Sequence, residues 1–273
     1  MKRNQSLFVG ILAGIAAGLM VLAAFNSGAL AFMLFFAAPA AIYIASMGWG
    51  RMAAIASIIS AAILTAYLGG SPVSVLTTLL LFGPAGYVGH LTNLGQKADD
   101  GSGIVWFPLS TILLHLMIIL AVGFVLVGVI SGYSPELFSA AFVDLMKNIA
   151  SARPDLPQIP DDELMRRASL YAGLIPIIVP CIWLLLHVLT AFVAANITRR
   201  SGLLARDEED IAATINLPIE AGGILAAGLI GTFERDGLLS VTDRPVQHIP
   251  ELRFRTDEMD RLITLEDLLS HQS

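Results

Sequence analysis

Residues 9–19, VGILAGIAAGL, place Gly10, Gly14 and Gly18 four positions apart in an apolar run. Ala13 and Ala17 repeat this spacing one position earlier. Side chains four positions apart share one face of a helix, so these small residues predict a smooth stripe that another helix backbone can approach closely. The stripe therefore predicts a helix-docking face, whose partner is either a helix of this chain or a helix of another membrane protein.

The composition is that of a membrane protein. Hydrophobic residues make up 56% of the 273 residues and charged residues only 14%, far from the balance of a soluble domain. Between Arg3 and Lys97, Arg51 is the only Lys, Arg, Asp or Glu. The net charge of -6 arises near the C-terminus, where residues 201–273 carry fourteen acidic and six basic residues. We therefore expect the N-terminal third to lie in the lipid bilayer.

Six apolar segments are long enough to cross the hydrocarbon layer, which takes about twenty helical residues. They comprise residues 7–25, 29–47, 52–68, 73–91, 104–130 and 170–196. Prolines lie inside or at the edge of several segments, namely Pro39, Pro84, Pro108, Pro176 and Pro180, and neighbouring helices can satisfy the carbonyl groups that they free. Because the first four segments are joined by very short linkers, they must form antiparallel hairpins. The sequence therefore predicts an all-α, polytopic membrane helix bundle with six spans.

Basic residues set the predicted orientation, because Lys and Arg in short loops favour the cytoplasmic side. With the N-terminus inside, that side receives Lys2, Arg3, Arg51, Lys97, Arg199, Arg200 and Arg206, whereas the outside hairpins 26–28 and 69–72 receive none. We expect a bacterial inner-membrane protein with both termini cytoplasmic, an outside loop over 131–169 and an acidic cytoplasmic tail over 201–273. A cleaved signal peptide ending near GALA, residues 28–31, is the alternative for the first segment, but its core is long and a second span follows almost immediately.

Residues 135–150 predict an amphipathic helix in the outside loop. Ser134 can cap its first turn, and Pro135 suits the first helical position. Apolar residues recur along it at helical spacing: Leu137, Phe138, Ala141, Phe142, Leu145, Met146 and Ile149. Two interpretations stay open, a lid over a pocket at the outer ends of spans five and six, or a helix that rests on the bundle or in the lipid interface. A second helix, capped by Asp161 or Asp162, should lead into the sixth span.

The predicted tail contains two apolar features. Residues 219–231 form an apolar stretch that is too short to span a membrane and includes Glu220, so we expect it to be interfacial or half of a membrane hairpin. From Thr256 onward, acidic residues in the first turn and apolar residues at helical spacing predict one short amphipathic helix. Such a helix is more typical of packing or partner contact than of a catalytic site.

Catalytic and metal-binding signatures are missing from the sequence, which has no phosphate-loop, nucleophile-elbow or zinc-protease motif. The single cysteine, Cys181, excludes a disulfide framework and a cysteine-based metal site. The absence of a basic tract with interleaved aromatic residues argues against nucleic acid as a partner. We therefore expect a protein that is not an enzyme and holds no metal and no cofactor.

Polar residues inside the predicted spans are the remaining candidates, because polar groups are costly in lipid. His115 and His187 lie at similar depth, near the middle of spans five and six. Two interpretations stay open: the pair binds a ligand or a proton, or each is a neutral histidine that hydrogen-bonds within the bundle. Weaker candidates are Trp183, Asn26, His90 and Trp106. Of these, Trp183 joins the two histidines as a candidate ligand-binding residue.

Several segments, in a fixed order, resemble a known family. They are GWGRMAAIASIISAAILTAYLGG (48–70), GPAGYVGHL (83–91), VWFPLSTILL (105–114) and ANITRRSGLLARDEEDIAATINLP (195–218). Over about residues 5–220 the chain resembles the alphaproteobacterial branch of the YybS-like predicted membrane proteins (domain of unknown function 2232), whose function is uncharacterised. In that family a further membrane segment opens at the position of Leu217 and Pro218, whereas here a charged tail begins at Glu234.

That family is distantly similar to the substrate-binding S components of energy-coupling-factor transporters. The similarity implies six spans, cytoplasmic termini, a small molecule bound near the outer face, and docking on a membrane coupling subunit through small residues of the first helix. It implies a non-enzymatic component for solute binding or uptake. The alternative is a scaffold or assembly protein that binds other membrane proteins and no solute.

Overall fold

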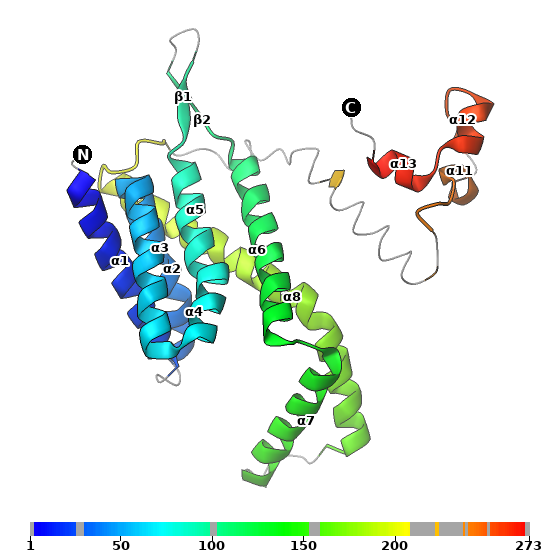
Figure 1. The fold of residues 1–273 in the computed structure, drawn as a ribbon, viewed down its shortest axis with the longest axis horizontal. Helices are drawn as coiled ribbons and strands as arrows, with labels where there is room; N and C mark the ends of the chain where they lie inside the picture. Colours follow the sequence, from blue (N-terminus) through cyan, green and yellow to red (C-terminus); the bar gives the residue numbers. More distant parts are fainter. Residues whose placement is uncertain are drawn as a thin grey trace. The chain divides into compact units, whose positions relative to one another are not determined.

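The chain forms two compact units, Met1–Thr214 and Ile215–Ser273, in a computed structural model. The structure describes residues 3–25, 30–98, 103–152, 159–207, 222–223, 237, 240–249 and 252–270. In the first unit, the described residues form helices and one small β-hairpin (Figure 1). Among the described residues, five helices are long and apolar enough to cross a membrane, which confirms a mostly helical membrane protein. The β-hairpin departs from the predicted all-α fold.

The predicted spans correspond to six apolar helical segments. They are α1 (Arg3–Ala24), α2 (Ala31–Trp49), α3 (Arg51–Gly69), the continuous helical segment Ser71–Thr92, α6 (Leu109–Ser131) and α8 (Asp161–Arg200). Within the part of the chain that the structure describes, five of them meet the length and apolarity of a membrane span, and α2 supplies only a shorter apolar helix, Met33–Trp49. The count of six spans therefore depends on α2.

The segment that corresponds to the fourth predicted span contains a wider turn at its middle. α4 (Ser71–Thr77) passes into a π-helical stretch, Thr78–Phe82, which continues as α5 (Gly83–Thr92). Pro84 stands in the first turn of α5 and has no N–H, so the carbonyl of Leu80, four residues earlier, loses its α-helical donor. The proline therefore frees the Leu80 carbonyl for a donor from another helix.

The fifth apolar helix begins later than the sequence predicts. Its predicted first residues, 104–108, instead include β2 (Ile104–Trp106), which pairs antiparallel with β1 (Gly95–Lys97). Pro108 then caps α6 in an extended conformation, with φ -60° and ψ 136°. The predicted boundary was wrong because hydropathy counts the apolar β2 residues as part of the span, whereas a proline disfavours helix in the residue before it.

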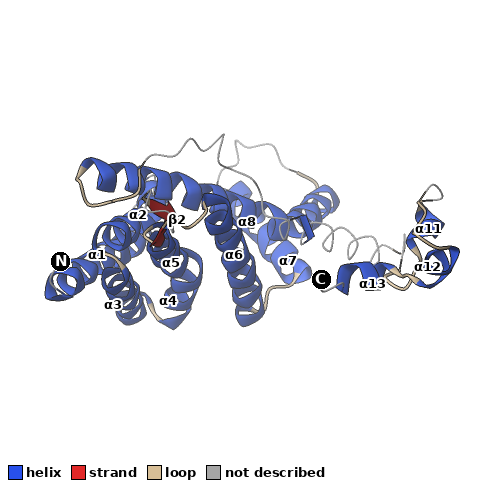
Figure 2. Ribbon diagram, turned by 90° about the horizontal axis from the view of Figure 1, so that it is seen from above, coloured by secondary structure: helices blue, strands red, loops and turns tan. Residues whose placement is uncertain are grey.

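α7 (Pro135–Ala152) and α8 form a helical hairpin at the end of the first unit that lies opposite the N-terminus (Figure 1). α8 is one continuous helix of 40 residues, and it packs against α2, α5 and α6 as it crosses the bundle (Figure 2). Ser134 caps α7 as predicted, because its hydroxyl accepts the Leu137 N–H at 3.1 Å.

The start of α8 differs from the prediction. Its N-cap residue is Pro160, and no side chain caps it. Asp161 and Asp162 lie in the first turn instead, where carboxylates interact favourably with the helix dipole. Asp161 also accepts a hydrogen bond from Lys147 of α7 at 2.7 Å, so it joins the two helices of the hairpin rather than capping one of them.

The hairpin has a small core of its own. Val143 of α7 is buried against Leu164 and Ala168 of α8, although Val143 does not belong to the predicted apolar stripe. Leu137 and Leu145, which do belong to it, are 67% and 53% exposed. The helix therefore uses only part of the predicted face to pack on α8.

A proline in α8 is compensated in the same hairpin. Pro176 lies inside the helix and frees the carbonyl of Ala172, four residues earlier. The hydroxyl of Tyr133, in the connection between α6 and α7, donates to that carbonyl at 2.8 Å. The expectation that neighbouring groups satisfy carbonyls freed by proline is thus met at this position.

The second unit contains three short described helices, α11 (Pro245–His248), α12 (Asp257–Leu262) and α13 (Leu265–Ser270). The prediction of one helix from Thr256 is wrong, since α12 ends before Thr264. The Thr264 hydroxyl accepts the Asp267 N–H at 3.1 Å, and Asp267 accepts the Thr264 N–H at 2.9 Å. This reciprocal capping starts a new helix where one continuous helix was expected.

A short hydrogen-bonded turn precedes α11. The Ser240 N–H and the His248 ring both donate to Asp243, at 2.8 and 2.9 Å, and these bonds hold the pKa of the Asp243 carboxyl below its ordinary value. The predicted interfacial stretch 219–231 lies outside the described residues, apart from Gly222 and Gly223.

Candidate functional site

The small-residue stripe of α1 lies against α3 of the same chain. The facing pairs are Gly10 with Ala53, Gly14 with Ser57 and Gly18 with Ala61. A Cβ atom at Gly10 would lie 2.5 Å from the carbonyl oxygen of Ala53, so glycine is required for this approach. The constant offset between paired residues means that the two helices run parallel, and the Ser60 hydroxyl donates to the Ile11 carbonyl across them at 3.2 Å.

The rest of the stripe agrees with this placement, since Ala17 is buried and Ala13 is half-buried. The predicted helix-docking face is therefore occupied within this chain. A coupling subunit, for which the resemblance implied docking on these residues, would have to use another surface.

His187 of α8 is fully buried, and both of its ring nitrogens have partners. Nε2 lies 2.8 Å from the carbonyl oxygen of Leu80, and Nδ1 lies 3.0 Å from the hydroxyl of Tyr43. Because a carbonyl can only accept, Nε2 carries the proton, and Nδ1 is left to accept from Tyr43. The Leu80 carbonyl is the one that Pro84 deprives of its helical donor. The contacts favour the interpretation that His187 is a neutral histidine hydrogen-bonded within the bundle.

His115 of α6 has different surroundings. Its ring stacks on Phe107 at a centroid distance of 6.0 Å and meets the edge of Tyr87 at 6.1 Å. Its Nδ1 atom is buried without a hydrogen-bond partner in the described part of the chain. No hydrogen bond or ring contact among the described residues joins His115 to His187, so the structure does not bring the predicted pair together.

The weaker candidates lie on different elements. Trp183 packs between Phe35 and Phe124, with ring centroids at 5.6 and 6.0 Å, one turn before His187 on α8. His90 lies in the last turn of α5 and Trp106 lies in β2, whereas Asn26 falls outside the described residues. Among the described residues, no group of three or more His, Cys, Asp or Glu side chains could hold a metal ion.

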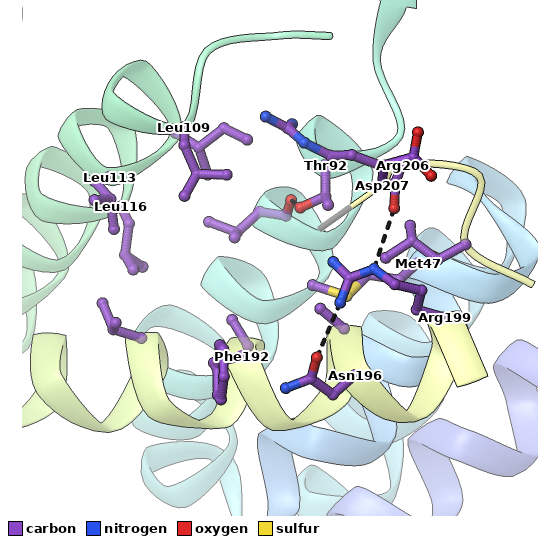
Figure 3. A pocket seen from close by; sticks show the side chains of 16 residues that line it. Met47, Thr92, Leu109, Leu113, Leu116, Phe192, Asn196, Arg199, Arg206 and Asp207 are labelled. Atoms are coloured by element: carbon purple, nitrogen blue, oxygen red, sulfur yellow. Dashed lines mark hydrogen bonds between the residues drawn. The ribbon is translucent and has the colours of Figure 1, made fainter. Parts of the chain in front are cut away.

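A cavity of about 150 Å³ lies between α5, α6 and α8, next to the C-terminal end of α2 (Figure 3). Most of its wall is apolar and includes Val88, Ile112, Leu116, Val188 and Ala191. His115, His187 and Trp183 do not line it. No prediction from the sequence pointed to this site, because membrane topology alone accounts for the basic residues near it.

Polar groups gather at one end of this cavity, where α8 ends and the following residues fold back (Figure 3). They comprise Thr92, Asn196, Arg199, Arg206 and Asp207. Arg199 donates through Nη1 to the side-chain oxygen of Asn196 at 2.9 Å and through Nε to the Arg206 carbonyl at 3.3 Å. Arg206 is only 3% exposed, and its Nη1 donates to the carbonyl of Phe107 at 2.9 Å.

The cavity does not lie where the sequence predicted a pocket. The expected place was the outer ends of spans five and six, beneath α7. The cavity instead adjoins the first residue of α6, Leu109, and the last turn of α8 around Arg199, whereas α7 packs on the first turns of α8. The two places are therefore at opposite ends of α6 and α8.

Comparison with known proteins gives a family but no activity. Residues 14–232 match the family described as predicted membrane protein (DUF2232). This match covers more than half of the chain and includes every residue that lines the cavity. No curated protein and no solved structure matches the chain.

Proposed function

The chain belongs to the DUF2232 family of predicted membrane proteins, and from this premise we propose that it is a non-enzymatic component that binds a small solute for uptake. The proposal includes membership of the alphaproteobacterial branch of the family and the distant similarity of the family to the S components of energy-coupling-factor transporters. A separate membrane protein would then supply the energy. The observation that supports the proposal is the apolar cavity between α5, α6 and α8, which has charged groups at one end.

The proposed topology has six spans, both termini in the cytoplasm and the chain in the bacterial inner membrane. α2 supports the sixth span by its length, since 19 residues extend over about 28 Å, close to the roughly 30 Å of the hydrocarbon layer. Arg51, Lys97 and Arg199 support the orientation, because they lie at or beyond the helix ends on the side of the β-hairpin. On this topology the cavity opens near the cytoplasmic side.

The chemistry of the cavity lining supports binding rather than catalysis. Guanidinium, amide and hydroxyl groups can hold the polar part of a ligand. A nucleophile next to a general base, which covalent catalysis requires, is not part of this lining as the structure describes it. The proposal therefore assigns recognition to the cavity and no reaction.

Native mass spectrometry of the full-length protein, extracted from its own membrane with a mild detergent, tests the proposal. A small molecule should remain bound, and Ala195→Leu should release it by filling the cavity that Ala195 lines. Ala121→Leu adds the same side chain on an exposed face of α6 and should retain the ligand. Loss from both variants, or from neither, contradicts binding in this cavity.

The same preparation distinguishes the alternative. Crosslinking in the membrane before extraction should identify a coupling subunit if the chain takes part in uptake. Crosslinks to other membrane proteins, together with no bound small molecule, would favour a scaffold or assembly protein instead.

A further inference from the structure

The size of the cavity between α5, α6 and α8 limits what it can hold. Its volume is about 150 Å³, which is the volume of an engineered apolar cavity that binds benzene. Drug-sized ligands occupy larger pockets, of about 300 Å³ or more. The apolar wall, with Val88, Leu116 and Val188 from three different helices, therefore fits one compact apolar group about as large as a single ring.

The polar end of the cavity carries charged side chains. Its lining contains the guanidinium groups of Arg199 and Arg206 and one carboxylate, that of Asp207. Among the described residues, both hydrogen bonds of Arg199 go to neutral oxygen atoms, one on Asn196 and one on the backbone. The Arg199 bonds hold the guanidinium plane at the cavity without neutralising it.

The neutral hydrogen-bond partners of Arg199 leave its charge available to a ligand. A guanidinium group binds a carboxylate through charge-assisted hydrogen bonds, which are about twice as strong as those between neutral groups. Asn196 lies one turn before Arg199 on α8 and fixes its orientation. An anionic ligand would supply the negative charge that these contacts do not provide.

We infer that the cavity takes a compact organic monoanion, in which an apolar group of about the size of a benzene ring carries one carboxylate. Arg199 is the anion-binding residue, and the walls from α5, α6 and α8 hold the apolar group. The inference rests on the proposed function, since it names the class of solute that the same cavity binds.

Calorimetric titration of the full-length protein in detergent micelles with three probes tests the inference. The probes are benzoate, benzyl alcohol and benzylammonium, which share one ring and differ in charge. Benzoate should bind most tightly, and Arg199→Gln should weaken it by about tenfold or more, because a hydrogen bond to a charged group is lost. The affinity for benzyl alcohol should change much less.

Arg200→Gln is the matched control, because it removes the same charge from the next residue, which is exposed and does not line the cavity. It should leave all three affinities unchanged. Arg199→Lys keeps the charge but loses the planar fork, so it should bind benzoate with intermediate affinity. Thermal unfolding of each variant shows whether it is folded.

A measurement on the unmodified protein covers the case in which the Arg199 variants do not fold. Raising the salt concentration should weaken benzoate binding and leave benzyl alcohol binding nearly constant, because salt screens only the charged interaction. Equal salt dependence for the two probes contradicts the inference.

The remaining outcomes separate the inference from the proposed function. If benzyl alcohol binds as tightly as benzoate and Ala195→Leu removes both, the cavity binds solutes but does not select anions. If benzylammonium binds most tightly, Asp207 rather than Arg199 recognises the ligand. If no probe binds at millimolar concentration, the inferred ligand class is wrong, and native mass spectrometry then decides the proposed function on its own.

Discussion

His187 and Arg199 lie on the same helix, and their polar groups are satisfied in different ways. At His187, both ring nitrogens are hydrogen-bonded, one to a backbone carbonyl and one to a tyrosine hydroxyl. The neutral ring has no hydrogen-bonding group left over. At Arg199, a charged side chain meets neutral oxygen atoms and lines a cavity. The difference is that the partners of His187 match its hydrogen-bonding groups, whereas the partners of Arg199 do not match its charge, and on the proposed function the unmatched charge is what binds a ligand.

The largest effect on folding should come from a larger side chain in the contact between α1 and α3. Gly14→Leu would overlap the Ser57 carbonyl and the Ser60 hydroxyl of α3. Overpacking costs about 1–3 kcal/mol, and more where the backbone cannot move, so we expect little folded protein. Size-exclusion chromatography and thermal unfolding in detergent measure this. Gly128→Leu on α6 is the control, since a Cβ at Gly128 would meet nothing within 4 Å, and an equal loss there would argue against the α1–α3 contact.

The next largest effect on stability should come from replacing His187. His187→Phe would leave the Leu80 carbonyl and the Tyr43 hydroxyl without this partner, and an unsatisfied buried group costs about 1–3 kcal/mol. We expect a lower unfolding temperature and unchanged probe binding in the cavity. Weakened probe binding in a folded variant would instead assign His187 to the site.

A second substitution, at Pro84, tests why a histidine occupies position 187. Pro84→Ala restores an N–H four residues after Leu80, so it should recover part of the stability lost in His187→Phe. A double-mutant cycle of the two substitutions measures this coupling. No recovery in the double variant would mean that the missing N–H of Pro84 does not explain the position of His187.

At the cavity end, we expect a local rather than a global effect. Arg206→Gln removes the charged donor to the Phe107 carbonyl, a bond of about 1.5 kcal/mol or more. Amide hydrogen exchange in residues 203–207 should therefore speed up roughly tenfold, as that free energy implies. Arg200→Gln should leave the exchange unchanged. A uniform rise in exchange across the helices would show that Arg206 supports the whole bundle.

The smallest effect should come from Tyr133→Phe. It removes the hydroxyl that donates to the Ala172 carbonyl, and the net contribution of one hydrogen bond to stability is about 0.5–1.5 kcal/mol. The unfolding temperature should fall slightly. Tyr67→Phe, at a side chain that is 85% exposed, should have no effect, and a matching decrease there would remove the case for the Tyr133 bond.

The helices could be predicted from the sequence because hydropathy and helix length follow directly from the thickness of a bilayer. The β-hairpin could not, since strands of three residues carry almost no periodic signal. The helix that packs on the glycine stripe could have been predicted, because Ala53, Ser57 and Ala61 repeat the same four-residue spacing. Matching small residues between predicted helices would have favoured the contact within the chain.

The candidate site was harder to predict. That Pro84 frees a carbonyl follows from the sequence, but which side chain reaches it depends on how the helices pack. Arg199 has a local signal, since Asn196 precedes it by one helical turn. The spacing of Asn196 and Arg199 marks a candidate site only because α5 and α6 pack beside it and form a cavity. The periodicity of the sequence does not predict that packing.

The length of α8 has a mechanical consequence. Its 40 residues extend over about 60 Å, roughly twice the thickness of the hydrocarbon layer. On the proposed topology, with residues 170–196 in the membrane, the nine residues that precede them in α8 stand outside over about 14 Å and carry α7. A tilt of about 10° about the cavity end of α8 would move its far end, about 60 Å away, by about 10 Å. Motion at the cavity end of α8 would thus be amplified on the opposite side of the membrane.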